Sequence, residues 1–126
     1  MIRRLLCSLL LLPLAAPGAG FSVSNVGLSG ASLKNLCDKS EGECFSYVIG
    51  AISGFEVAYT VFLDAQRRNN VHIIVYPYCI PDGVTREKVY EAAKSYLYRH
   101  PERLQFDASS DIIAGLAEAY PCGKPR

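Results

Sequence analysis

The longest apolar stretch of the chain runs from residue 40 to residue 65, and its apolar side chains fall on every face of a helical wheel. Ser40 and Glu43 stand in the spacing of a capping box, which marks the start of a helix. A helix that is apolar all round has to be buried. We therefore predict one long, buried central helix around which the other elements pack.

An apolar stretch of this length would also suit a membrane span. Glu56 lies in its middle, however, where a carboxylate in lipid costs a few kcal/mol. We therefore expect the mature protein not to span a membrane. Gly50 and Gly54 lie four residues apart and form a flat strip that suits the close approach of another element.

Three further helices follow from apolar periodicity and capping residues. The first covers residues 32–37, with Ser29 or Ser32 as its cap. Another runs from its cap Thr85 to about residue 99, and the last covers residues 108–120 after the cap Asp107. The predicted fold is all-α, a small four-helix bundle.

The segment of residues 67–78 is the least regular part of the chain. Its arginines and asparagines end the central helix, and the β-branched run that follows, residues 71–75, would form a strand if it had a partner. No second strand-like run exists in the mature sequence. We therefore expect an extended segment laid over the helices.

The first twenty residues have the pattern of a secretory signal peptide: a basic start with Arg3 and Arg4, an apolar core, and a small-residue exit near Gly20. Residues 21–126 then form a single exported, periplasmic domain. Of 13 lysines and arginines, 11 remain after Arg3 and Arg4 are removed, against 12 acidic residues. This balance gives no reason to expect a nucleic-acid partner.

Four cysteines remain in the mature chain, and an even number in an exported protein of this size predicts two disulfides that staple the bundle. If residues 67–78 return along the central helix, Cys79 comes back beside Cys44, and the end of the last helix brings Cys122 toward Cys37. We therefore predict the pairs Cys44–Cys79 and Cys37–Cys122. No CxxC pair or histidine at ligand spacing indicates a metal site.

The sequence offers no catalytic constellation. Oxidised cysteines leave no thiolate for nucleophilic catalysis, and motifs such as GxSxG, HExxH or a phosphate-binding glycine loop are missing from the sequence. We expect a binding module without a cofactor rather than an enzyme.

Four sequence clusters in order resemble the Rap/Tai family of periplasmic immunity proteins. They are CFSYVIG at residues 44–50, CIPDGVT at 79–85, YLYRHPERL at 96–104 and AGLAEAYPC at 114–122. The resemblance implies a small helical domain, related in shape to the acid-stress chaperone HdeA. It also implies that the protein neutralises a peptidoglycan amidase effector delivered into the periplasm by type VI secretion. The alternatives are an HdeA-like binding or chaperone-like protein with another partner, and a small-molecule binder that uses a pocket between helices.

The segment of residues 67–78 is also the candidate surface for a protein partner, because arginine and tyrosine often dominate binding energy at interfaces. Alternatively, Val71, Ile73 and Val75 close the core, or two such segments pair edge to edge in a homodimer. The residues expected to contact the partner are Arg67, Arg68, Asn69, Asn70, Tyr76 and Tyr78.

Overall fold

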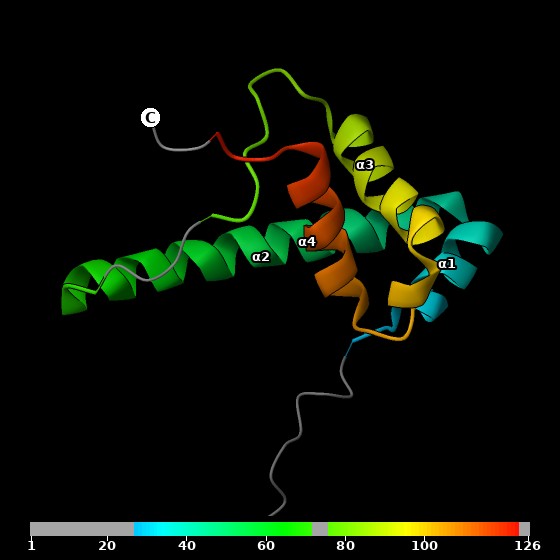
Figure 1. Cartoon of the computed structure of the whole chain (residues 1–126), viewed down its shortest axis with the longest axis horizontal. Helices are drawn as coiled ribbons and strands as arrows, with labels where there is room; N and C mark the ends of the chain where they lie inside the picture. The colour runs from blue at the N-terminus through cyan, green and yellow to red at the C-terminus, as the bar shows by residue number, and fades with distance from the viewer. Residues whose placement is uncertain (1–26, 72–75, 124–126) are drawn as a thin grey trace, which may run out of the picture.

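The computed structural model describes residues 27–71 and 76–123, and these residues form an all-α fold (Figure 1). The described residues contain no β-strand, only an isolated bridge between Ser29 and Asp107. The predicted signal peptide, residues 1–20, lies outside the described part. The elements in order are α1 (Gly30–Lys39), α2 (Glu41–Asn69), α3 (Arg86–Arg99), the 3₁₀ turn η2 (Pro101–Arg103) and α4 (Ala108–Ala119).

The helix starts lie where the capping residues predicted them. The side chains of Ser29, Ser40, Thr85 and Asp107 each accept a hydrogen bond from a backbone N–H in the first turn of the helix that follows. These N–H groups have no partner within the helix, so a side-chain acceptor at this position stabilises the helix start.

The core lies between the first half of α2 and the other three helices. The buried apolar cluster consists of Leu33, Cys37, Cys44, Val48, Ile52, Tyr78, Val89, Tyr90, Ala93, Leu97, Ala108, Ile112 and Leu116.

Helix α2 is as long as predicted, but only its first half is buried. Its 29 residues extend about 43 Å, whereas α1, α3 and α4 gather around one end of it (Figure 1). Its fully buried side chains are Cys44, Val48 and Ile52. The prediction of burial along the whole helix is wrong because three short helices cannot cover a helix of this length.

The length and composition of α2 would also allow it to cross a membrane. Over its most apolar 18 residues, the mean hydropathy is 1.4 and 11% of the residues are buried. The core helix of a soluble protein can meet the same criteria. That α2 does not span a membrane therefore stays a prediction.

The two disulfides join other pairs of cysteines than predicted. Cys37 in the last turn of α1 bonds to Cys44 in the first turn of α2, with 4.7 Å between the Cα atoms. Only Ser40 separates the two helices, so the chain reverses and brings these turns together. The second disulfide is Cys79–Cys122.

The incorrect pairing came from the assumption that the chain after α2 returns along the whole helix. Tyr78 returns only as far as Glu56, to which its hydroxyl donates a hydrogen bond of 2.7 Å. Cys79 then lies beside the end of α4, where its backbone N–H donates to the carbonyl of Tyr120 at 2.8 Å. Cys122 comes shortly after Tyr120 in the chain and therefore lies near Cys79. Cys44 is too far along α2 for Cys79 to reach it.

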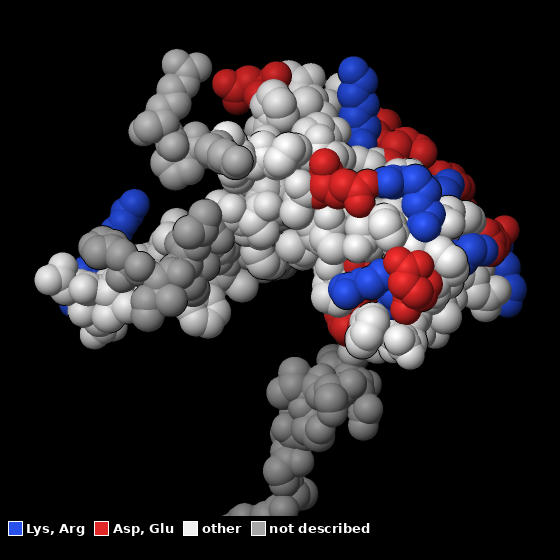
Figure 2. All heavy atoms as spheres, viewed as in Figure 1, with Lys and Arg blue, Asp and Glu red and all other residues white. Residues whose placement is uncertain are grey.

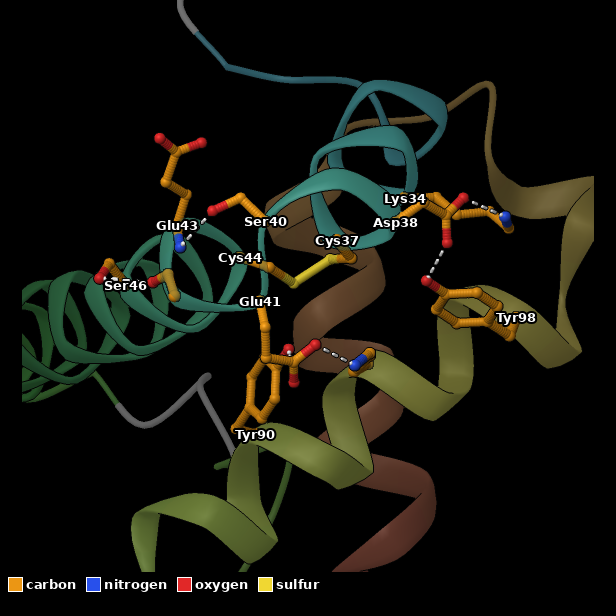
Figure 3. The surroundings of a disulfide bond; sticks show 12 residues. Lys34, Cys37, Asp38, Ser40, Glu41, Glu43, Cys44, Ser46, Tyr90 and Tyr98 are labelled. Atoms are coloured by element: carbon orange, nitrogen blue, oxygen red, sulfur yellow. Dashed lines mark hydrogen bonds and ion pairs between the residues drawn. A yellow bond between two sulfur atoms is a disulfide. The ribbon is translucent and has the colours of Figure 1, made fainter.

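Two acidic side chains tie the corner between α1 and α2 to α3 (Figure 3). Asp38 accepts a hydrogen bond from the hydroxyl of Tyr98 at 2.6 Å. Glu41 accepts one from the hydroxyl of Tyr90 and one from the ammonium group of Lys94, each at 2.7 Å. The disulfide and these contacts together fix the direction in which α2 leaves the bundle.

The glycines that allow close helix packing are not those of α2. A Cβ atom added at Gly115 of α4 would lie 2.8 Å from the Cβ of Tyr96 and 3.2 Å from the Cα of Ala93, so α3 and α4 pack here without a side chain between them. Added Cβ atoms at Gly50 and Gly54 would meet nothing within 4 Å. The predicted close approach of another element to this strip is therefore not found in the described residues.

Candidate partner-binding surface

The second half of α2 projects from the bundle and carries exposed apolar side chains. Val57 is 66% exposed, Val61 is 63% exposed and Phe62 is 59% exposed. Figure 2 shows that, in this view, the projecting part has few charged side chains until its far end. Apolar side chains gathered on a projecting element are typical of an interaction surface.

An aromatic cluster covers another side of the same half-helix. The rings of Tyr59 and Tyr76 meet edge to face with their centroids 4.3 Å apart, and the rings of Tyr76 and Tyr78 are 5.0 Å apart. Phe55 lies 5.9 Å from Tyr78 and stacks on Tyr59 at 6.1 Å. Such aromatic pairs stabilise a packed arrangement beyond the area that they bury. The cluster therefore holds the returning chain against α2.

Glu56 is the polar anchor of this cluster. The carboxylate of Glu56 accepts the hydrogen bond from Tyr78, whose side chain is 1% exposed. Burial, followed by the contact with Glu56, raises the pKa of Tyr76 to about 12, and the same two causes raise the pKa of Tyr78 further. Both tyrosines are therefore neutral hydrogen-bond donors at physiological pH.

The arginines and asparagines expected at the partner surface lie at the exposed end of α2. Helix α2 extends through Asn69, so Arg67, Arg68 and Asn69 form the end of the helix, as predicted. Arg68 pairs with the carboxylate of Asp64 one turn earlier. Asn70 has a φ of 55° and ends the helix in the left-handed conformation that asparagine tolerates.

The two tyrosines expected at this surface differ in exposure. Tyr76 is half-buried and lies at the edge of the aromatic cluster, whereas Tyr78 belongs to the core. The expectation that Tyr78 contacts a partner is therefore wrong, because its ring is enclosed and its hydroxyl is bound to Glu56. Val71 is exposed, and Ile73 and Val75 lie outside the described residues.

The sequence reasoning missed Val57, Val61 and Phe62 as surface residues because their apolar character assigned them to the core. One signal could have identified them. After the helix, the chain returns to the core by Pro77 and Pro81. So short a connecting segment cannot cover both the far end and the sides of a helix of 29 residues.

A pocket of about 230 Å³ opens between α2, the loop before α3 and the start of α3. Its walls are apolar except for Ser53 and Arg86. Small-molecule sites combine an apolar wall with several converging polar groups, and this pocket has few. The lining residues are Ile49, Ile52, Ser53, Ile80, Val84, Arg86 and Val89.

The described residues contain no group of three or more histidine, cysteine, aspartate or glutamate side chains that could hold a metal ion. His100 contacts two carboxylates, those of Glu102 and Glu118, at 3.1 and 3.2 Å. These contacts connect η2 to α4 and serve the packing of the bundle.

Comparison with known proteins gives one match. The family model of Rap1a immunity proteins matches residues 29–122, which is nearly the whole of the described fold. The chain belongs to the Rap1a immunity protein family. The comparisons with curated proteins and with solved structures gave no match.

Membership of the Rap1a family confirms the resemblance of the four sequence clusters. Each cluster has a structural role in this Rap1a protein: the first and second contain the cysteines Cys44 and Cys79, the third ends α3, and the last contains Gly115 and Cys122. An immunity protein of this kind binds a protein effector and acts as an inhibitor. A protein-binding surface is therefore the functional site to be expected on this fold.

Proposed function

We propose that this protein is a periplasmic immunity protein that binds a peptidoglycan amidase effector of type VI secretion and occludes its catalytic cleft. The observation that carries the proposal is the family match over residues 29–122. Two disulfides support the compartment, because disulfides persist in oxidising environments such as the periplasm. Because an amidase effector acts on the cell wall, its inhibitor has to act in the same compartment.

The proposed contact surface is the far end of α2 together with Tyr76. An α-helix with its side chains is about 10–12 Å across, which is narrow enough to enter an enzyme cleft. Phe62 supplies exposed aromatic area, and interfaces are enriched in aromatic and arginine anchors. The remaining contacts come from Arg67, Arg68, Asn69 and Asn70, all exposed at the helix end.

Occlusion by this surface requires that the projecting helix is held rigidly. The Cys37–Cys44 disulfide and the Glu41–Tyr90 hydrogen bond fix its base, and the aromatic cluster fixes its middle. A rigid binding element loses less conformational entropy on association, and so retains more of the contact energy as affinity. The chain needs no reactive group for such a role.

Growth protection in a bacterial host tests the proposal. Where a peptidoglycan-hydrolase gene lies beside this gene, its product is exported to the host periplasm and should cause lysis there. Co-expression of this protein should restore growth, and deletion of residues 1–20 should abolish protection, because the protein then stays in the cytoplasm. Lysis that continues with the full-length protein present, or protection that persists without residues 1–20, would contradict the proposal.

Alanine variants locate the surface. Phe62→Ala and Tyr76→Ala should each weaken effector binding by about tenfold or more, as expected for interface anchors. Glu91→Ala on the exposed side of α3 is the matched control and should bind as the wild type does. Equal affinities of all three variants would show that the effector binds elsewhere.

A small-molecule function remains a second candidate, and the pocket beside Arg86 is the observation that favours it. An apolar ligand with a carboxylate would place its acid at Arg86 and its apolar part against Ile52 and Val89. Tight binding of such a ligand in the absence of any protein effector, lost in Val89→Trp, would support this candidate over the immunity role.

A further inference from the structure

The two disulfides differ in their accessibility to solvent. Cys37 is 6% exposed and Cys44 is 0% exposed, so the bridge between α1 and α2 is enclosed in the core. Cys79 is exposed and Cys122 is half-buried, so the second bridge lies at the surface. The rate of thiol–disulfide exchange depends on access to the sulfur atoms. A thiol in solution therefore reaches the second bridge in the folded protein, whereas it reaches the first only after unfolding.

The surroundings of the second bridge distinguish its two sulfur atoms. Sγ of Cys122 lies 3.6 Å from the carbonyl oxygen of Tyr76. The partial negative charge of this oxygen repels a thiolate that approaches Cys122. Cys79 has the larger exposed fraction of the two residues. Sγ of Cys79 is therefore the atom that a thiolate attacks more readily.

We propose that the Cys79–Cys122 bridge is an exchange site for a low-molecular-weight thiol, and that its reduction loosens the surface around Tyr76. The thiolate attacks Sγ of Cys79, a new S–S bond forms between the two, and the bond to Cys122 breaks. Cys122 leaves as a thiolate and takes a proton from water, and its S–H group then donates to the carbonyl of Tyr76. A second thiolate attacks the sulfur of the first reagent molecule and releases Cys79. Two thiols are thereby oxidised to one disulfide, and two cysteines are reduced.

The bridge lies beside the main attachment of residues 76–80 to the end of α4. The backbone N–H of Cys79 donates to the carbonyl of Tyr120, and within the described chain this is the one backbone-to-backbone hydrogen bond of residues 76–80. Reduction removes the covalent tie next to it. The enclosed ring of Tyr78 and its hydrogen bond to Glu56 keep the segment on α2. Residues 76–80 therefore loosen beside α4 without unfolding of the bundle.

The loosened segment carries part of the surface proposed for the effector, and this consequence rests on the proposed function. Tyr76 is half-buried, and its carbonyl contacts the sulfur of Cys122. A less rigid surface loses more conformational entropy on association, so the reduced protein binds the effector more weakly. The protein then inhibits fully only in an oxidising compartment, where the bridge persists.

Reaction of the folded chain of residues 21–126, the predicted mature protein, with reduced glutathione tests the exchange site. Iodoacetamide stops the reaction and traps free thiols, and peptide mapping then locates each modification. Glutathione should be found on Cys79, the free thiol on Cys122, and the Cys37–Cys44 bridge should be intact. The exposed bridge should react at least about tenfold faster than the enclosed one, because access differs. This difference should disappear in protein unfolded by urea, which is the matched control.

Three results of the mapping would overturn the proposal. They are glutathione on Cys122 in preference to Cys79, equal rates of reaction of the two bridges in the folded protein, and no reaction before unfolding. None of these results depends on the effector, so the exchange site is tested separately from the proposed function.

A double variant, Cys79→Ser with Cys122→Ser, tests the loosening. Order parameters from ¹⁵N relaxation should fall for residues 76–80 from about 0.85 toward about 0.6, while those of α3 stay unchanged. Affinity for the candidate amidase should fall by about tenfold relative to the oxidised wild type. Unchanged order parameters of residues 76–80, or loss of the helical circular dichroism spectrum, would overturn this inference whether or not the amidase binds. Failure of the oxidised wild type to bind would instead contradict the proposed function.

Discussion

The hydroxyl of Tyr78 donates a 2.7 Å hydrogen bond to the carboxylate of Glu56, and this bond joins the chain that returns to the core to the middle of α2. It lies at the boundary between the packed and the projecting halves of the helix. Glu56 therefore interrupts the apolar helix where the returning chain needs a polar partner. Its role in the structure is to hold the base of the projecting half.

Tyr78→Phe should lower the free energy of unfolding by about 1–2 kcal/mol, because the half-buried carboxylate loses its donor while the aromatic packing is retained. Urea denaturation followed by circular dichroism measures this change. Glu56→Gln is the matched control, since its amide oxygen can still accept the hydrogen bond. Equal stability of Tyr78→Phe and the wild type would show that the hydrogen bond does not hold the segment.

Two glycine-to-alanine variants should change stability in opposite directions. Gly115→Ala should lower the free energy of unfolding by about 1–3 kcal/mol, since the new methyl group overlaps Tyr96 and Ala93 and forces α3 and α4 apart. Gly42→Ala lies in open space and should raise it by up to about 1 kcal/mol. Thermal unfolding of both variants checks this pair, and a stabilised Gly115→Ala would contradict the close packing of α3 on α4.

The sequence was sufficient to predict the helices and their starts, because capping and periodicity are local properties. Thr85 and Asp107 cap α3 and α4 as expected. The course of the chain after Asn70 depends instead on tertiary contacts of Tyr76 and Tyr78, which no local pattern encodes. The wrong disulfide pairing follows from that segment, whereas the burial of α2 was overestimated because three short helices cannot cover a helix of this length.

The candidate surface was predictable only in part for the same reason. Arg67 and Asn69 are polar at a helix end, so their exposure follows from the sequence. In the sequence, the exposed Val61 cannot be distinguished from a buried valine. Its exposure is evident only from the structure, in which no described element covers it. That the positions of Gly50 and Gly54 are open is likewise evident only from the structure.

Peptide mapping under non-reducing conditions should find Cys37 joined to Cys44 and Cys79 joined to Cys122. Trypsin cleaves after Lys39, so the first pair connects two separate peptides. In the chain-entropy model, the 7-residue separation of the first pair corresponds to about 2.5 kcal/mol and the 43-residue separation of the second to about 4 kcal/mol. Detection of Cys44 joined to Cys79 would contradict the course of the chain after α2.

Stability should fall in acid through Asp38 and Glu41. Lys34 and then Tyr98 lower the pKa of Asp38 below 3.8, and Lys94 and then Tyr90 lower the pKa of Glu41 below 4.5. Because both folded-state values are depressed, the stabilisation is present above about pH 5 and is lost as the pH falls through those values. Burial raises the pKa of Asp111, which acts in the opposite direction.

A variant comparison isolates the effect of the two acids. Asp38→Asn with Glu41→Gln should be less stable than the wild type at pH 7, and the two proteins should converge in acid once both carboxylates are protonated in the folded wild type. Urea midpoints between pH 2 and pH 7 measure the difference. Curves that stay parallel over this range would show that these carboxylates do not hold the corner to α3.

Inhibition of the purified amidase tests the central claim most directly. Residues 21–126, the predicted mature protein, are titrated into the candidate amidase effector while hydrolysis of peptidoglycan is measured. We predict that activity falls linearly to zero at one protein chain per effector chain, and that this protein alone releases no peptide. Full effector activity at excess protein, or hydrolysis of peptidoglycan by this protein itself, would contradict the account.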